Sequence, residues 1–137
     1  MRWCFDDQPN PYADQILDRI RGGDQAVVPI LWLYEVVAVV SKAKRRGILP
    51  AAKAQSFLDH LRALDIVVDE VDYDIIFNKV LALATRHGLS GYDVSYLELA
   101  QRKMLPLATL DEELRLAAPA AGVLLVTASS DLEIARR

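Results

Sequence analysis

The spacing of apolar residues along the chain predicts a series of helices interrupted by short strands. Apolar positions that recur every three or four residues predict helices, and short continuous apolar runs predict buried strands. Helices are expected at residues 11–21, 30–46, 50–64, 73–87, 91–100 and 114–118, and strands at 26–28, 66–68, 105–110 and 123–126. A brief tail helix is expected after Ser129. This alternation is typical of an α/β fold with a mostly parallel sheet.

Polar residues mark where several of these helices begin. Asn10, Asp72 and Ser90 are each expected to act as an N-cap, because their side-chain oxygens accept hydrogen bonds from free backbone N–H groups at a helix start. In the helix at 73–87, five apolar residues are spaced so as to face the core: Ile76, Val80, Leu81, Leu83 and Ala84.

Two acidic residues stand at the ends of predicted elements. Asp93 lies in the first turn of a helix, and Asp111 follows the run 105–110, which predicts a buried parallel strand. Ligands of open α/β sheets bind beyond the carboxyl ends of the strands, and Mg²⁺ prefers oxygen ligands, so a shared metal site is one interpretation. The other interpretation is local: Ser90 and Asp93 form a capping box, and Asp111 is a simple N-cap.

Glu35 lies in a helix that is apolar nearly all round from Ile30 to Val40. It is the only charged residue between Asp24 and Lys42. A carboxylate is costly to keep charged among apolar side chains unless it is paired. Glu35 is therefore expected either to form a structural ion pair with a distant arginine, or to serve as a metal ligand or acid–base group.

The composition limits the class of protein. A chain of 137 residues is the size of one domain, and we expect a single domain over residues 1–137. The net charge of −3 excludes a surface coated with positive charge for nucleic acid, so any such contact must be local. The single cysteine, Cys4, cannot form an internal disulfide, which fits a cytoplasmic protein. Neither a signal peptide nor a membrane span is expected.

The densest basic cluster lies at the end of the helix 30–46. It consists of Lys42, Lys44, Arg45 and Arg46. Cations suit a helix C-terminus, so a solvated helix end explains the cluster without any ligand. These residues are also candidates for local phosphate contacts with RNA. Three further cations join the candidates: Arg86, Arg102 and Lys103.

The three acids, in their sequence contexts, resemble the PIN-domain family, in particular the VapC-type toxins of VapBC toxin–antitoxin systems. The motif around Glu35 is Pro-x-Leu-Trp-x-x-Glu-Val, and the motif around Asp93 is Tyr-Asp-x-x-Tyr-Leu-x-Leu-Ala. Asp111 ends the segment Ala-Thr-Leu-Asp, eighteen residues after Asp93. The resemblance runs from Trp3 to about Val126.

The resemblance implies a PIN-like three-layer α/β/α fold, with a short, mostly parallel central sheet flanked by helices. It implies a Mg²⁺- or Mn²⁺-dependent endoribonuclease in which Glu35, Asp93 and Asp111 hold the metal and Thr109 supports the last of them. It further implies RNA as substrate, a homodimer, and inhibition by a cognate VapB-type antitoxin whose C-terminal segment lies over the acidic crevice. The apolar content of 53% fits an oligomer or partner interface.

The chain departs from the family pattern at its start. Members of the family begin with a short apolar strand that ends in an Asp, a little before the position of Trp3, and neither has a counterpart here. Asp6 and Asp7 match a later acidic position, so they are not taken as metal ligands. Either the protein starts upstream of Met1, or its site has three acids instead of four.

Two classes of function follow from these observations. The first is a VapC-like toxin ribonuclease. The second is a non-catalytic PIN-like module that has lost its first metal-binding Asp and binds RNA or protein. A metal-dependent phosphatase is a weaker third class, because the sequence has no phosphate-binding loop. Binding of Mg²⁺ or Mn²⁺ through the acids distinguishes the enzyme from the binding module.

Overall fold

The computed structural model describes residues 11–126, which fall into two compact units divided between Val68 and Asp69. The predicted N-cap Asn10 and the tail helix expected after Ser129 lie outside the described residues, as does Cys4. Among residues 11–126, no helix combines the length and apolar character needed to cross a membrane. A single domain over the whole chain stays a prediction.

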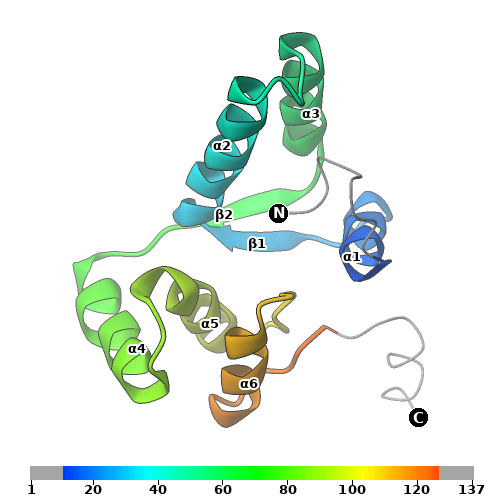
Figure 1. Cartoon of the computed structure of the whole chain (residues 1–137). Helices are drawn as coiled ribbons and strands as arrows, with labels where there is room; N and C mark the ends of the chain where they lie inside the picture. Colours follow the sequence, from blue (N-terminus) through cyan, green and yellow to red (C-terminus); the bar gives the residue numbers. More distant parts are fainter. Residues whose placement is uncertain (1–10, 127–137) are drawn as a thin grey trace. The chain divides into compact units, whose positions relative to one another are not determined.

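The first unit holds three helices and a two-stranded sheet (Figure 1). Its elements are α1 (Pro11–Arg21), β1 (Ala26–Pro29), α2 (Ile30–Arg45), α3 (Ala51–Ala63) and β2 (Ile66–Asp69), whose last residue, Asp69, already belongs to the second unit. The two strands pair with each other and run in the same direction. All five elements lie where the apolar spacing predicts them, with ends shifted by one or two residues at most.

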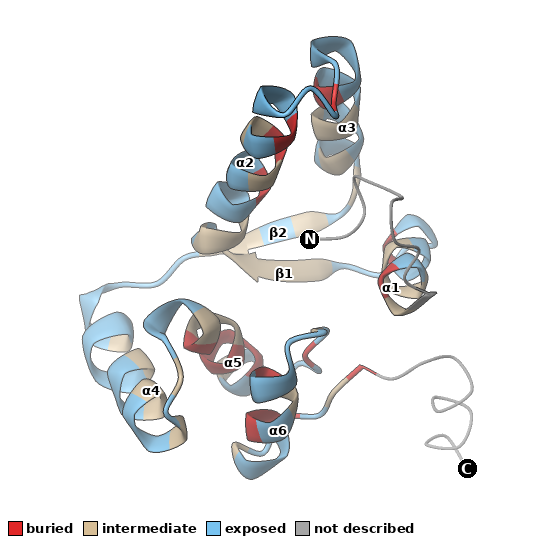
Figure 2. Ribbon diagram, in the orientation of Figure 1, coloured by how far each residue is buried: buried red, intermediate tan, exposed pale blue. Residues whose placement is uncertain are grey.

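The core of the first unit lies between α2 and α3. Val36, Val40 and Ala43 form a buried stripe along α2, one turn apart, and pack with Leu49 and Ala54. Figure 2 shows these buried positions of α2 on the side that faces α3. The remaining faces of α2 are open to solvent, so this apolar helix is buried along only one stripe.

The second unit contains four helical segments joined by short loops (Figure 1). They are η1 (Ile75–Val80), α4 (Leu81–His87), α5 (Gly91–Lys103) and α6 (Glu112–Ala120). Asp72 acts as the predicted N-cap, because its Oδ1 accepts a hydrogen bond from the N–H of Ile75 at 3.2 Å. Gly88 ends α4 with φ of 64°, a left-handed conformation that glycine adopts without steric cost.

The helix predicted at 73–87 differs from expectation in its middle. The segment η1 is a π-helix, with hydrogen bonds that skip one residue more than in an α-helix. Ile76 and Leu81 were expected to face the core, but they are 42% and 62% exposed. Val80, Leu83 and Ala84 are half-buried, so the predicted face is only partly correct.

The strands predicted at 105–110 and 123–126 shrink to a single parallel bridge between Leu107 and Leu125. The N–H of Leu107 donates to the carbonyl of Leu124 at 2.8 Å, and the N–H of Val126 donates to the carbonyl of Leu107 at 2.9 Å. Leu105 and Leu110, at the two ends of the run, are about 40% exposed. The pairing is parallel as predicted, but the expectation of a buried six-residue strand is wrong.

The core of the second unit joins α5 and α6 around that bridge. Leu97 is fully buried, and Leu107 and Ala118 contact the same cluster. The other buried members are Ala100, Leu114, Ala117 and Val123. Because α5 and α6 share this core, the starts of both helices belong to one packed unit.

Ser90 fixes the start of α5 as predicted, since its Oγ accepts a hydrogen bond from the N–H of Asp93 at 3.0 Å. Ser90→Ala is expected to lower the free energy of unfolding by about 1 kcal/mol, because it leaves that N–H without its cap. Urea unfolding measures the change. Ser95→Ala, inside the same helix, is the matched control and should change stability by less than about 0.5 kcal/mol. Equal effects of the two substitutions would contradict a capping role for Ser90.

Candidate functional site

Asp93 occupies the first turn of α5, as the sequence predicts. The cap comes from Ser90, and Asp93 contributes its backbone N–H to it. Its side chain is half-buried, next to Val94, which is completely buried. The N-terminus of a helix carries partial positive charge, which stabilises a carboxylate in the first turn. The cap at the start of α5 therefore uses the hydroxyl of Ser90 and the backbone of Asp93, and this cap bond does not involve the carboxylate of Asp93.

Asp111 is the N-cap of α6, so the local interpretation is confirmed for this residue. Its Oδ1 accepts a hydrogen bond from the N–H of Leu114 at 3.0 Å. Its own N–H donates to Oγ1 of Thr109 at 3.1 Å, and Arg115 Nη1 donates to the carbonyl of Thr109 at 2.8 Å. These bonds give the loop before α6 a defined shape. The cap bond engages one of the two carboxylate oxygens, which is compatible with a second ligand on the other.

Glu35 lies in the first unit, on α2, and its environment differs from the expectation. The sequence predicts a carboxylate surrounded by apolar side chains, but Glu35 is exposed. The reason is that α2 buries only the stripe of Val36, Val40 and Ala43. Four apolar neighbours on the other faces of α2 are also exposed: Ile30, Leu33, Tyr34 and Val37.

The donor set of the predicted site suits a hard divalent cation. Carboxylate and hydroxyl oxygens are the ligands that Mg²⁺ and Mn²⁺ prefer, and Asp111 and Glu35 are both open to solvent. The second unit brings Asp93 and Asp111 to the starts of two helices that share a core. Within residues 11–126, neither unit by itself gathers three acidic, histidine or cysteine side chains into a group able to hold a metal ion.

The basic residues predicted to contact RNA differ in how far their side chains are exposed. Lys42, Lys44, Arg45 and Arg46, at the end of α2, are all exposed. Arg45 Nη1 donates to Oγ of Ser41 at 3.1 Å, within the same helix. The side chain of Arg102 is only 19% exposed and binds two carboxylates, so it is not available as a phosphate contact.

The two partners of Arg102 are acids that the sequence analysis did not single out. Glu98 and Asp69 are 3% and 7% exposed at their side chains. The hydrogen bonds that Arg102 donates, first to Asp69 and then to Glu98, raise the pKa of Arg102 above its already high ordinary value. A raised pKa on a base means that its contribution to stability persists up to high pH, so Arg102 stays charged throughout the neutral range. The spacing of Glu98 and Arg102, four residues apart on a helix, was the available signal.

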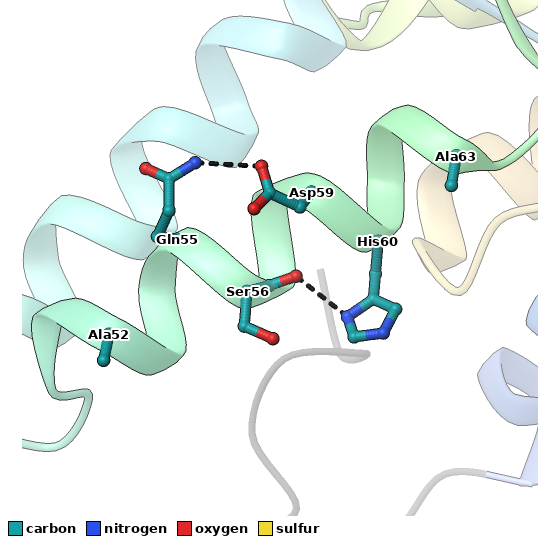
Figure 3. A pocket seen from close by; sticks show the side chains of 6 residues that line it. All are labelled: Ala52, Gln55, Ser56, Asp59, His60 and Ala63. Carbon is teal, nitrogen blue, oxygen red and sulfur yellow. Dashed lines mark hydrogen bonds between the residues drawn. The ribbon is translucent and has the colours of Figure 1, made fainter.

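A shallow pocket of about 340 Å³ lies along α3 (Figure 3). Its polar side chains bind within the helix: Gln55 Nε2 donates to Oδ1 of Asp59 at 2.9 Å, and His60 Nδ1 lies 2.8 Å from the carbonyl of Ser56. Every residue in 11–126 that lines it comes from this one helix.

Comparison with known proteins agrees with the resemblance that the motifs carry. The model of the PIN domain family matches residues 2–119. A curated relative, Ribonuclease VapC3 of Pyrobaculum aerophilum, is 33% identical over 81 residues, which cover 59% of this chain. The chain spans 62% of the length of that relative. The match to the family model includes Glu35, Asp93 and Asp111. The helices and the parallel pairing of the strands fit the α/β/α fold class. The chain therefore belongs to the PIN-domain family.

Proposed function

We propose that this protein is a VapC-like toxin, a Mg²⁺- or Mn²⁺-dependent endoribonuclease that a cognate VapB-type antitoxin inhibits in the cytoplasm. The observation that carries the proposal is the family match over residues 2–119, with acids at all three motif positions within it. The similarity to a protein named as a ribonuclease supports RNA as the substrate.

In this proposal Glu35, Asp93 and Asp111 hold the metal, and each contributes carboxylate oxygen. A bound divalent cation supplies an activated water for in-line attack on a phosphodiester and stabilises the charge that develops. Local hydrogen bonds within the chain fix the positions of Asp93 and Asp111. Ser90 fixes the helix turn that presents Asp93, and Leu114 holds one oxygen of Asp111. Thr109 supports Asp111 by accepting its backbone N–H.

The exposed cations at the end of α2 are proposed to bind RNA phosphates. Lys42, Lys44, Arg45 and Arg46 are open to solvent and close together in sequence. The overall charge of −3 leaves such a local cluster as the source of attraction for a polyanion. Their binding would be non-specific for sequence, because phosphate contacts position the nucleic acid without identifying its bases.

The exposed apolar face of α2 supports the proposed protein partners. Ile30, Leu33, Tyr34 and Val37 are 40–70% exposed on the helix that carries Glu35. Large exposed apolar side chains in a group are typical of interaction surfaces. We propose that an antitoxin segment or the second copy of a homodimer covers this face.

A non-catalytic binding module is the second candidate. The observation in its favour is that α2 carries both exposed cations and an exposed apolar face, which could bind RNA or protein without any cleavage. Such a module would retain the exposed cations and the apolar face of α2 without supporting cleavage.

Metal dependence distinguishes the two candidates. The purified protein is mixed with transfer, ribosomal and messenger RNA in Mn²⁺ or Mg²⁺, and the products are separated on a gel. Cleavage is expected with either metal and should stop when EDTA removes it. Glu35→Gln and Asp111→Asn should each lower the rate by about 100-fold, because each removes a negative oxygen ligand.

Glu113→Gln is the matched control for these substitutions, since it removes an acid from the first turn of α6 without touching Asp111. It should leave the rate unchanged. RNA binding without cleavage in either metal would favour the binding module, and cleavage that persists in EDTA would rule out the proposed metal site.

A further inference from the structure

A buried ion cluster lies in the second unit. Its buried part consists of Arg102 with Asp69 and Glu98, and the half-exposed Lys103 also pairs with Asp69 through its Nζ, 3.9 Å from Oδ1. The Nε of Arg102 donates to Glu98 Oε2 at 2.9 Å, and its Nη2 donates to Glu98 Oε1 at 3.1 Å. On the other side, Nη1 donates to Asp69 Oδ1 at 3.3 Å, and Nη2 donates to Asp69 Oδ2. One guanidinium thus binds two carboxylates at once.

Stability alone is a weak explanation of this cluster. Burying charges costs desolvation energy, and well-packed apolar residues often replace a buried ion network without loss of stability. What the cluster adds is direction, because the flat guanidinium binds a carboxylate pairwise in only a few orientations. The apolar contacts of α5, through Val94 and Leu97, set which face of the helix is buried, and the ion pairs add directed bonds to that packing.

The cluster lies on the same helix as Asp93. Glu98 and Arg102 follow Asp93 by five and nine residues along α5. At about 100° per residue, both point roughly to the opposite side of the helix from Asp93. A rotation of α5 about its own axis would therefore break the bonds to Asp69 and turn Asp93 by the same angle.

We propose that Arg102 is a positioning residue: by joining Asp69 to Glu98 it sets the rotation of α5 and thereby the direction of the Asp93 carboxylate. This inference rests on the proposed function, which makes Asp93 a metal ligand. Arg102 itself touches neither RNA nor metal. It acts through the helix that both residues share.

The decisive variant replaces the whole cluster with apolar residues: Asp69→Leu, Glu98→Met and Arg102→Met together. No buried charge is left unpaired, so the protein should remain folded with a similar unfolding temperature. Mn²⁺ affinity, measured by calorimetric titration without RNA, should fall about 10-fold, on the scale of losses seen when ligand-orienting residues are removed. The kcat for cleavage should fall by about 10–100-fold, with a smaller change in KM.

Arg102→Lys provides the second test. Lysine keeps the charge but cannot form the paired bonds to both carboxylates, so Mn²⁺ affinity and kcat should lie between those of the wild type and the triple variant. If the triple variant does not fold, the Mn²⁺ affinity and kcat of Arg102→Lys alone test the positioning role of Arg102. Arg62→Met, an exposed arginine of α3, is the control for loss of a positive charge and should leave all three quantities unchanged.

Unchanged Mn²⁺ affinity and kcat in a folded triple variant, or in Arg102→Lys if the triple variant does not fold, would overturn the inference. The proposed function fails separately, if Asp93→Asn has no effect on cleavage. If the wild-type protein neither binds Mn²⁺ nor cleaves RNA, both are wrong. If Asp93→Asn abolishes cleavage while the cluster variants behave like the wild type, only the positioning role is lost.

Discussion

Asp93→Asn is expected to lower the rate of RNA cleavage by about 10²–10³-fold, which corresponds to the several kcal/mol that a bound metal contributes to a transition state. The substitution keeps the size of the side chain and the backbone N–H that Ser90 Oγ accepts. It removes only the negative charge that attracts a divalent cation. Cleavage rates in Mn²⁺ and the Mn²⁺ affinity measured without RNA should therefore fall together.

Asp14→Asn is the matched control, because Asp14 is also an acid in the first turn of a helix, α1, where it is exposed. Both substitutions remove one charge from a helix N-terminus, so both lose a similar favourable interaction with the helix dipole. Only Asp93→Asn should affect cleavage. Equal rates for the two variants would show that Asp93 is not a metal ligand.

Leu97→Ala is expected to lower the free energy of unfolding by about 2–5 kcal/mol. Leu97 is completely buried in the cluster that joins α5 to α6, and its truncation leaves a cavity among Leu107, Leu114 and Ala118. A loss at the upper end of this range would remove much of the stability of a typical domain. Urea or thermal unfolding monitored by circular dichroism measures it.

Leu116→Ala is the control for this substitution. Leu116 lies on α6 but is 80% exposed, so its truncation removes few contacts and should change stability by less than about 0.5 kcal/mol. A similar cost for both variants would mean that the core of the second unit is not centred on Leu97.

The helices could be predicted closely from the sequence because their signals are local. Apolar spacing placed α1, α2 and α3, and the caps at Asp72 and Ser90 formed as expected. The π-helix η1 could not be predicted in this way, because its extra residue per turn leaves no separate mark in the apolar spacing. The strand expected at 105–110 was overestimated, since pairing depends on a partner far away in the chain. Only Leu107 finds one.

In the candidate site, too, features with a local sequence signal could be predicted, whereas features that depend on distant residues could not. The motifs around Glu35, Asp93 and Asp111 pointed to the family, and the family match bears that out. Their role as metal ligands stays a prediction. The exposure of Glu35 was missed because an apolar sequence does not reveal which faces of a helix are covered. The pairing of Arg102 with Asp69 joins residues 33 positions apart, so Arg102 seemed a free cation in the sequence.

The apolar face of α2 has a thermodynamic consequence for whatever covers it. Ile30, Leu33, Tyr34 and Val37 keep a layer of water ordered around them while the chain is alone. A partner that binds there releases this water, so its association carries a negative heat-capacity change. RNA bound through Lys42, Lys44 and the neighbouring arginines instead displaces counterions, and its affinity falls with added salt. The two kinds of ligand on this helix can therefore be told apart: the binding enthalpy of the protein partner changes with temperature, and the affinity of RNA changes with ionic strength.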